Sequence, residues 1–308
     1  MPVIAERGSQ VYYAPGRIDR LRQEENQATS SPEKTPSCVF CPGNEILTPP
    51  EVWTYNNEGN YFRDRDSAGG WEVRVVPNKF PLVGVEDHEV IIVTPDHAGS
   101  FSNMSERQIE IVLFAHRERI KAHQQNKKDV VVFANVKRPS GASQDHLHTQ
   151  LVTLNPGEIE PDNHEMPLDE RTIVATEGDF VLYCPEESEF PFEMVIQSRR
   201  PIGTFGDLYD EELKPVATLF RKATWALENN RFAQIISSKT HREDGVPYNF
   251  YIKKSRYPDG DGWCIRFNPR LTIPAGFEQA TGRIINIVPP QQAAEVLRET
   301  LEQFPQAA

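Results

Sequence analysis

Apolar residues recur with helical spacing in two long segments of the chain, and each segment follows an apolar run typical of a strand. The first helical segment begins after Ser105, where Gln108 completes a capping box, and its stripe consists of Ile109, Val112, Leu113, His116 and Ile120. The second runs from Asp210 to Asn229, and its stripe consists of Leu213, Val216, Leu219, Phe220 and Ala223. We predict an α-helix in each segment.

The surroundings of the two helices repeat when the chain is compared with itself at a shift of 104 residues. Residues 88–92 then lie over 192–196, and residues 99–101 lie over 203–205. Each helix is followed by an apolar run that we predict to be a strand, 130–133 after the first and 232–236 after the second. The alternative to a true repeat is chance similarity between two strand-turn-helix units.

Two such units in tandem predict an α+β fold of two related halves, each an antiparallel sheet with a packed helix. The polar, proline-containing stretch 155–170 predicts the join, so we expect halves at residues 1–157 and 158–308. The shift also places three polar side chains of the first half over Phe250, Ile252 and Lys254; these three are His146, His148 and Gln150. We therefore expect one active centre per chain.

Composition narrows the function classes. A chain of 308 residues can bury a large core, and a net charge of −12 argues against general binding of nucleic acid. No stretch resembles a signal peptide or a membrane span, so we expect a cytoplasmic protein without a membrane partner. The spacing of Cys38 and Cys41 is that of a metal half-site, whereas Cys184 and Cys264 are expected to be small buried residues.

The segment between the predicted strands 130–133 and 151–154 carries the most specific chemistry. A Gly-Ala-Ser turn at 141–143 leads to His146, His148 and Gln150, which share one face if the segment is extended. Two imidazoles and an amide on one face are costly to bury without a purpose. For either histidine alone, the alternative is an ordinary hydrogen-bonded residue on a polar sheet face.

The His-x-His-x-Gln spacing after Gly-Ala-Ser resembles the signature of the histidine triad superfamily. Other segments resemble its galactose-1-phosphate uridylyltransferase family, and these are Cys38–Glu45 with Thr48–Glu51, Val76–Pro81, His88–Val90 leading to His97, and Pro269–Asn286. The resemblance covers most of the chain. It implies an α+β fold of two tandem histidine-triad-like halves that form a pseudo-dimer within the chain.

The resemblance implies nucleotidyl transfer through a covalent nucleotidyl-histidine. His148 is then the nucleophile, and a backbone carbonyl of its own loop holds its second ring nitrogen. Gln150 and Ser143 donate hydrogen bonds to phosphoryl oxygens, aided by the backbone amides of Gly141 and Ala142. For nucleotidyl transfer through His148, the other protein groups need only position the α-phosphate and neutralise its charge.

The resemblance also implies one structural zinc ion per chain, held in a closed tetrahedral site by Cys38, Cys41, His97 and His146. His146 is an alternative nucleophile, but ligation of a metal would occupy its lone pair. The implied substrate contacts are Arg17 and Arg20 near the nucleotide, Asn78, Lys79 and Phe80 around base and ribose, Asn135 at phosphate or sugar, and Phe277 with Glu278 at the hexose across a homodimer. A solvated charge cluster is the alternative for the two arginines, a core position for Phe80, and a surface carboxylate for Glu278.

Two departures from the family pattern leave the acceptor open. Residues 263–268 contain no histidine, so we do not expect the second metal of many bacterial members, and Phe277 stands where galactose enzymes often have tyrosine. The leading hypothesis is transfer of a nucleoside monophosphate from a nucleotide sugar to a hexose 1-phosphate. The second is an ADP-sugar or dinucleoside-polyphosphate phosphorylase with inorganic phosphate as acceptor, and the third is a non-catalytic, zinc-containing nucleotide-binding protein.

Overall fold

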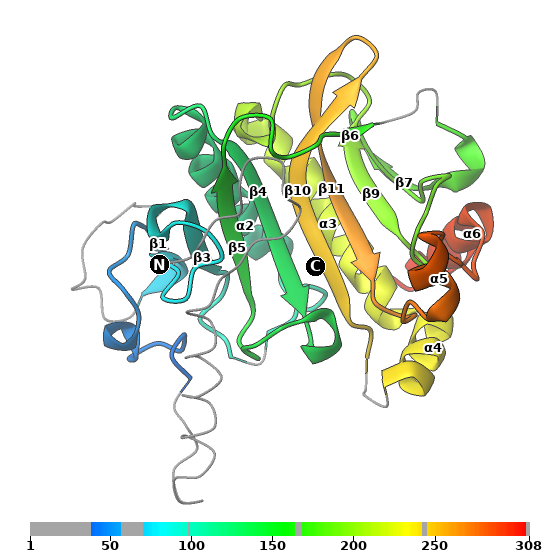
Figure 1. The fold of residues 1–308 in the computed structure, drawn as a ribbon, viewed down its shortest axis with the longest axis horizontal. Coiled ribbons are helices and arrows are strands. Elements are labelled where there is room, and N and C mark those ends of the chain that lie inside the picture. The colour runs from blue at the N-terminus through cyan, green and yellow to red at the C-terminus, as the bar shows by residue number, and fades with distance from the viewer. Residues whose placement is uncertain (1–37, 57–69, 98, 164–167, 242–244, 306–308) are drawn as a thin grey trace, which may run out of the picture. The chain divides into compact units, whose positions relative to one another are not determined.

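The computed structural model describes residues 38–56, 70–97, 99–163, 168–241 and 245–305 (Figure 1). The chain forms two compact units that each draw on several stretches of sequence. Unit 1 consists of Met1–Gly99, Ala122–Val132 and His146–Ile159, and unit 2 consists of Ser100–Lys121, Phe133–Asp145 and Glu160–Ala308. Arg17 and Arg20 lie outside the described residues.

Unit 1 is built on antiparallel strands in the order β1-β2-β3-β5-β4. The strands are β1 (Trp53–Asn56), β2 (Trp71–Pro77), β3 (His88–Ile92), β4 (Asp129–Val136, which continues into unit 2 from Phe133) and β5 (His148–Leu154). The predicted strands at 130–133 and 151–154 are confirmed as parts of β4 and β5. Opposite β5, Ile92 pairs with His148 and Val90 pairs with Gln150, so β3 is the immediate neighbour of the candidate site.

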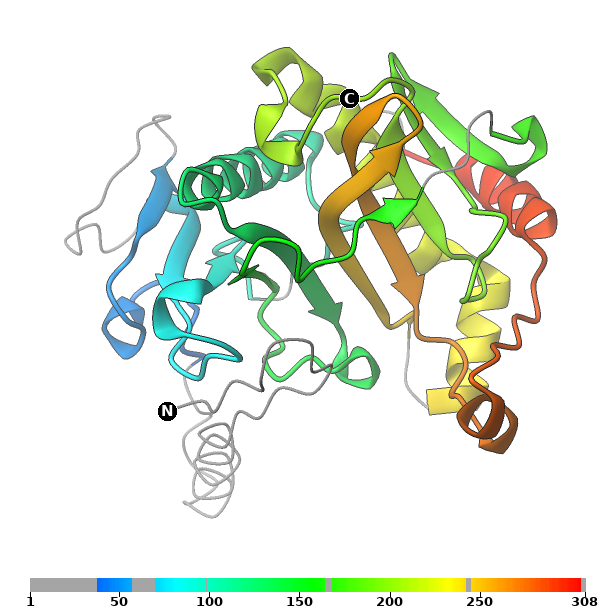
Figure 2. The same cartoon turned by 45° about the horizontal axis from the view of Figure 1, so that its top comes forward.

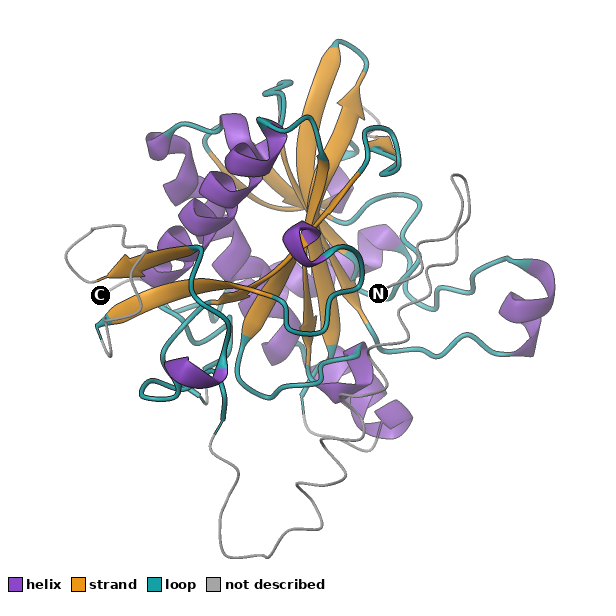
Figure 3. Ribbon diagram, turned by 60° about the vertical axis from the view of Figure 1, so that its left-hand side comes forward, coloured by secondary structure: helices purple, strands orange, loops and turns teal. Residues whose placement is uncertain are grey.

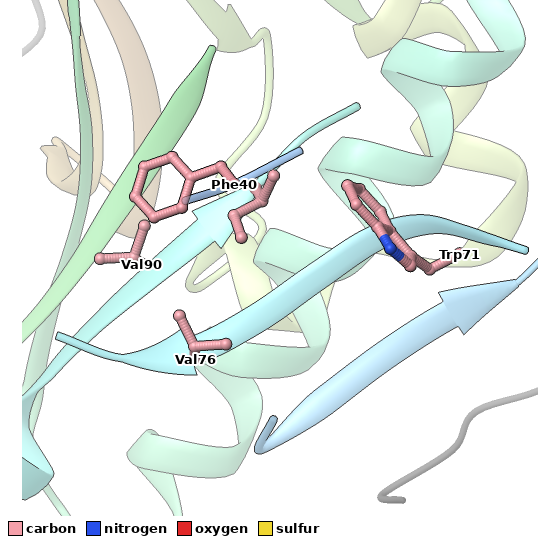
Figure 4. Close-up of a cluster of buried hydrophobic side chains, with 5 residues drawn as sticks. Phe40, Trp71, Val76 and Val90 are labelled. Atoms are coloured by element: carbon pink, nitrogen blue, oxygen red, sulfur yellow. The ribbon is translucent and has the colours of Figure 1, made fainter. Parts of the chain in front are cut away.

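A hydrophobic cluster fixes the segment around residue 40 to the sheet of unit 1. Figure 4 shows Phe40 with Trp71, Val76 and Val90, which are all buried. Polar contacts reinforce this attachment, since the Trp71 Nε1–H donates to Glu45 Oε1 at 2.9 Å. The buried Arg74 Nε also donates to Glu51 Oε1 at 2.9 Å. Arg74 Nη2 donates to Thr48 Oγ1 at 3.2 Å as well, so residues 38–51 are attached to β2 by apolar burial and by three side-chain hydrogen bonds.

Unit 2 contains a second set of strands, in the order β7-β8-β9-β11-β10, with β6 parallel to β10. The strands are β6 (Asp162–Asn163), β7 (Ile173–Glu177), β8 (Phe180–Tyr183), β9 (Met194–Ser198), β10 (Tyr248–Tyr257) and β11 (Gly260–Pro269). Its helices are α2 (Glu106–Gln124), α3 (Asp210–Asn229), α4 (Arg231–His241), α5 (Gly276–Thr281) and α6 (Pro290–Leu301). Among the described strands, β10 and β11 form the longest antiparallel pair (Figure 2). The helices and strands are distinguished by colour in Figure 3.

The core of unit 2 lies between α3 and the sheet. Helix α3 packs on β7, β8 and β9, and α6 packs on α3 and β7. Four aromatic rings form a continuous cluster with centroids 5.1–5.8 Å apart, and they belong to Phe101, Phe220, Phe250 and Phe267. Edge-to-face contacts of this kind add to the gain from burying the rings.

Both predicted helices are confirmed. Helix α2 begins one residue after Ser105, whose Oγ accepts the backbone N–H of Gln108 at 3.1 Å, and α3 has the predicted bounds. The predicted apolar stripes of the two helices are buried. Among the described residues, no helix is both long enough and apolar enough to cross a membrane. Cys184 and Cys264 are completely buried, as predicted.

The predicted strand at 232–236 is wrong, because these residues lie in α4. The Asn230 side chain accepts hydrogen bonds from the backbone N–H groups of Phe232 and Ala233, at 2.9 and 3.2 Å, and so starts a new helix. Ala233 and Ser237, four residues apart, form the buried face. Apolar residues at 232, 235 and 236 fit helical spacing as well as they fit a short apolar strand, which explains the error.

A buried group of charges joins β6 to the β9–β10–β11 part of unit 2. Asp162 accepts from Arg266 Nε at 3.0 Å and from Lys253 Nζ at 2.5 Å, and Arg266 also binds the buried Glu193. These side chains line a cavity of about 440 Å³. Burial raises the pKa of Asp162, but the charges of Arg266 and Lys253 outweigh burial and hold the pKa below its usual range. At Glu193 burial prevails, and its pKa is raised despite Arg266.

We predict that Arg266→Leu lowers the free energy of unfolding at pH 8 by roughly 3–5 kcal/mol, because it leaves the buried Glu193 without its cation and Asp162 with Lys253 alone. The deficit should shrink towards pH 5, since loss of Arg266 raises the already raised pKa of Glu193 further, and the folded variant then takes up a proton before the folded wild type does. Urea unfolding at both pH values measures this. As a control, Arg171→Ala, which removes an exposed partner of Asp169, should leave the urea midpoint almost unchanged. A deficit that grows on acidification contradicts this account.

Candidate active site

A strained loop between β4 and β5 precedes the candidate histidines. Gly141 has a φ of +93°, and Lys137 has a φ of +70°. This region of backbone conformation favours glycine and explains Gly141. The Asn135 amide donates to the Gly141 carbonyl at 3.3 Å, and Asn249 Nδ2 donates to Asn135 Oδ1 at 2.7 Å and to the Ser140 carbonyl at 2.9 Å. Asn135, which we expected at the substrate, therefore also holds the loop in its conformation.

The backbone amides expected to bind phosphate are already used within the loop. The N–H of Gly141 donates to the Arg138 carbonyl at 2.9 Å, and the N–H of Ala142 donates to the Lys137 carbonyl at 3.3 Å. Ser143 is half-buried in the same segment. The phosphate contacts expected of these three loop residues stay predictions.

His148 is held in one tautomer by its own backbone. Its Nδ1 lies 2.9 Å from the His146 carbonyl oxygen, which can only accept, so Nδ1 carries the proton. The lone pair of Nε2 is therefore available for attack on an electrophile. Burial lowers the pKa of His148, and the bond to the carbonyl opposes only part of this shift, so the ring is neutral near pH 7. His148 is 9% exposed, enough for contact at one ring edge.

Gln150 lies two residues after His148 on β5, and its side-chain oxygen takes part in a polar cluster. Oε1 lies 2.9 Å from Nε2 of His88 and 3.4 Å from Nδ2 of Asn78. Asn78 Oδ1 accepts the backbone N–H of Phe80 at 2.8 Å. Asn78 was expected at base and ribose, and here its amide faces Gln150. His88 was not predicted as a site residue, although it opens the segment His88–Val90 that contributes to the family resemblance.

Four side chains of unit 1 converge as a candidate metal centre. The donor atoms of Cys38, Cys41, His97 and His146 all lie within 4.8 Å of one another. His146 Nδ1 lies 3.7 Å from Cys38 Sγ and 3.6 Å from Cys41 Sγ, and His97 Nδ1 lies 3.4 Å from Cys41 Sγ. Tetrahedral bonds of the length that zinc makes to sulfur and nitrogen separate ligand atoms by about 3.3–3.8 Å. These three separations therefore fit a tetrahedral ion.

Local structure aims these donors at a common point. The Cys41 N–H donates to the Cys38 carbonyl at 3.1 Å, so a tight turn places both thiols on one side. His146 Nε2 donates to the Thr94 carbonyl at 2.8 Å, which leaves Nδ1 unprotonated towards the thiols. Burial, followed by the neighbouring Cys38, raises the pKa of Cys41. A divalent cation at the centre would favour the thiolate and offset both effects.

Phe40 connects the candidate metal centre with the candidate nucleophile. It lies between the two cysteines, and its ring belongs to the hydrophobic cluster of Figure 4. The ring centroid lies 6.1 Å from that of His146 and 5.3 Å from that of His148. The turn that carries the thiols therefore also packs against the ring whose Nε2 is available.

The remaining predicted substrate residues lie at or near the surface. Lys79 is exposed and lies 5.9 Å from the centre of the half-buried Phe80 ring. In unit 2, Phe277 is 52% exposed at the start of α5. Glu278 Oε2 accepts the Ala275 N–H at 2.9 Å and so caps α5. One carboxylate oxygen of Glu278 thus has a structural partner.

Comparison with known proteins yields relatives of one kind, although no family model matches the chain. An ADP-glucose phosphorylase of Arabidopsis thaliana is 25% identical, with 94% of this chain and 89% of that protein aligned. A galactose-1-phosphate uridylyltransferase of Thermotoga maritima is also 25% identical, with 87% of this chain and 91% of that protein aligned. A solved uridylyltransferase structure superimposes with a TM-score of 0.69 at 17% identity, covering 99% of this chain and 100% of that one.

These relatives match nearly the whole chain, and the shared fold is α+β with extensive antiparallel sheet. Both named relatives are enzymes. Three of the motifs that carried the resemblance lie on β3, at β5 and on the turn at Cys38–Cys41, within unit 1, whereas Pro269–Asn286 lies in unit 2. The chain is therefore similar along most of its length to galactose-1-phosphate uridylyltransferases and to an ADP-glucose phosphorylase.

Proposed function

We propose that the protein is a nucleotidyltransferase that moves a nucleoside monophosphate from a nucleotide sugar through a covalent intermediate on His148. The observation that carries this proposal is the hydrogen bond from His148 Nδ1 to the His146 carbonyl, which leaves the Nε2 lone pair available. Gln150, two residues on, supplies an amide on the same strand face.

In the first step, the Nε2 lone pair attacks the α-phosphorus of the nucleotide sugar. A P–N bond forms, the bond from the α-phosphorus to the bridging oxygen breaks, and the sugar 1-phosphate leaves with the electron pair. The ring becomes cationic, and the His146 carbonyl stabilises its Nδ1–H. The second step reverses this: an oxygen of the acceptor attacks phosphorus, and Nε2 regains its lone pair. Gln150 and Ser143 donate hydrogen bonds to the non-bridging oxygens.

We also propose that the four donors of Cys38, Cys41, His97 and His146 hold one zinc ion. Two thiolates and two imidazoles with tetrahedral separations are a donor set that zinc prefers. All four positions are taken by protein, so the role is structural. The ion, when bound, links the turn at Cys38–Cys41 to the residue whose carbonyl orients His148.

Strand order supports the proposal of two tandem histidine-triad-like halves, near 1–157 and 158–308. The chain enters its strands in the same order in each unit, β1-β2-β3-β5-β4 and β7-β8-β9-β11-β10, with a long helix after the third strand. In this correspondence β11, not β10, takes the place of β5. It places Ile265 and Phe267 opposite Ile196 and Met194, as the first half places His148 and Gln150 opposite Ile92 and Val90, so one active centre per chain is expected.

A homodimer is part of the same proposal. Exposed apolar side chains gather in one short segment of unit 2, and these are Ile273, Phe277, Ile284, Ile285 and Ile287, each at least half exposed. Such a concentration marks an interaction surface. The segment includes Glu278, which would thereby be presented to the partner's site.

Two acceptors remain candidates for the second step. Hexose 1-phosphate is the leading one, since Thermotoga maritima has a uridylyltransferase relative and Glu278 retains one oxygen for a sugar hydroxyl. Inorganic phosphate is the second, and it is favoured by the alignment of the Arabidopsis ADP-glucose phosphorylase along 94% of this chain. Both use the same intermediate on His148.

We expect His148→Ala to reduce turnover to below about 1% of wild type, because it removes the attacking atom. The urea midpoint should stay near that of wild type. Mass spectrometry after incubation with UDP-glucose or ADP-glucose should place the nucleotidyl group on His148. The matched control is His123→Ala, which removes a histidine bonded to Glu89 and should retain activity. A variant that turns over at a tenth of the wild-type rate excludes His148 as the covalent residue.

For the metal, we expect elemental analysis to find one zinc per chain. Cys38→Ser or His97→Ala should lose the ion and lower the melting temperature by roughly 5–10 °C, because a closed site contributes folding energy. Cys184→Ala, which removes a buried thiol of unit 2, should keep the zinc. Freshly purified wild-type protein without zinc would disprove this assignment.

The acceptor is determined by discharging preformed nucleotidyl-enzyme with phosphate or with hexose 1-phosphate. We expect hexose 1-phosphate to discharge the wild type faster. Glu278→Ala should slow this reaction by about 10- to 100-fold through loss of a charged hydrogen bond, with little effect on discharge by phosphate. The control is Glu295→Ala, an exposed carboxylate on α6. Faster discharge by phosphate in the wild type assigns the phosphorylase reaction instead.

A further inference from the structure

His88 is a completely buried histidine beside the proposed catalytic strand. It opens β3 and pairs with Val152 of β5, while Val90 pairs with Gln150, so His88 and Gln150 are diagonal neighbours across the two strands. Nε2 of His88 lies 2.9 Å from Oε1 of Gln150. A buried polar ring at this position requires partners on both nitrogens.

The backbone determines which nitrogen of His88 carries the proton. The N–H of Leu82 donates to Nδ1 at 2.9 Å. A backbone N–H can only donate, so Nδ1 is unprotonated and the neutral ring carries its proton on Nε2. The atom of Gln150 that faces Nε2 must then be an acceptor. This assigns the carboxamide oxygen, rather than the NH₂ group, to the side of His88.

A second backbone group fixes the orientation of Asn78, and this supports the same assignment of the Gln150 carboxamide. The N–H of Phe80 donates to Asn78 Oδ1 at 2.8 Å, so the NH₂ group of Asn78 is the end that points the other way. Its Nδ2 lies 3.4 Å from Gln150 Oε1 and 3.1 Å from His88 Nε2. Two donors side by side thus converge on one oxygen of Gln150.

We propose that His88, assisted by Asn78, is a positioning residue that fixes the orientation of the Gln150 carboxamide. With Oε1 held by two donors, the NH₂ group of Gln150 is the end left for the phosphoryl oxygens. The inference rests on the proposed role of Gln150 in nucleotidyl transfer. Without these donors the carboxamide can rotate, and its reversed orientation sets an oxygen against a phosphoryl anion, which is repulsive.

The tautomer can be tested without any substrate. A long-range ¹H–¹⁵N spectrum of protein labelled with ¹⁵N-histidine should show His88 protonated on Nε2 and His148 protonated on Nδ1, two opposite tautomers on neighbouring strands. Assignment uses the spectra of His88→Gln and His148→Ala. A proton on Nδ1 of His88 overturns the proposal, because Nε2 would then be an acceptor and Gln150 would turn its NH₂ group inwards.

The functional test is a single-turnover measurement of His148 nucleotidylation with labelled nucleotide sugar. We expect His88→Phe, which keeps a ring but no donor, to slow nucleotidylation by about 10- to 100-fold while the affinity for donor changes less than about 3-fold. His88→Gln, which can place an N–H near the same oxygen, should stay within about 5-fold of wild type. Slowing by Gln as large as by Phe would mean that a donor at this position does not restore the rate, and would refute the role.

A double-mutant cycle separates positioning from general damage. In a Gln150→Ala background, His88→Phe should slow nucleotidylation by less than about 3-fold, since its target is absent. If the fold-changes caused by His88→Phe and by Gln150→Ala simply multiply in the double variant, His88 does not act through Gln150. If the wild type forms no nucleotidyl-His148 at all, the proposed function fails, while the tautomer measurement still decides the arrangement of His88, Asn78 and Gln150.

Discussion

The candidate site depends on backbone groups that assign a tautomer to each of three histidines. The Thr94 carbonyl takes the Nε2–H of His146 and turns the Nδ1 lone pair towards two thiols. The His146 carbonyl takes the Nδ1–H of His148 and leaves the Nε2 lone pair for chemistry. The Leu82 N–H occupies the Nδ1 lone pair of His88 and makes Nε2 a donor. One side-chain type thus fits the three proposed roles of ligand, nucleophile and hydrogen-bond donor, because a different main-chain group contacts each ring.

Attachment of the amino-terminal turn to the sheet gives this arrangement its rigidity. Phe40 is buried among residues of β2 and β3, and Glu45 and Glu51 bond to Trp71 and Arg74 of β2. These contacts place the thiols of the turn opposite His146 before any ion is considered. A metal at the centre would then add a covalent-like link at a position that apolar packing already defines.

In the proposed tandem arrangement β11 takes the place of β5, and apolar side chains replace the proposed catalytic ones. Ile265 and Phe267 pair with Ile196 and Met194 as His148 and Gln150 pair with Ile92 and Val90. Between them on β11, Arg266 is neutralised by Asp162 and Glu193. Two apolar side chains neither ligate a metal nor attack phosphorus, which agrees with the proposal of one active centre per chain.

Local sequence determined much of this protein. The spacing of apolar residues predicted both long helices and the strands at 130–133 and 151–154, because these periods depend only on the geometry of each element. The resemblance carried by the motifs identified the four donors that the structure brings together. Residues 232–236 fit the apolar spacing of a helix and of a short strand equally well. The hydrogen bonds of the Asn230 side chain start a helix there, and the spacing of apolar residues alone did not predict this.

Tertiary structure decided the direction in which polar groups point. Whether an amide N–H faces a ligand or its own loop depends on φ and ψ several residues away, so the internal bonds of Gly141 and Ala142 and the loop contacts of Asn135 were not visible in the sequence. His88 acquires its significance only because strand register sets it beside Gln150, 62 residues further along the chain. The sequence thus specified which chemical groups are present, and the packing of β3 against β5 specified their protonation and their partners.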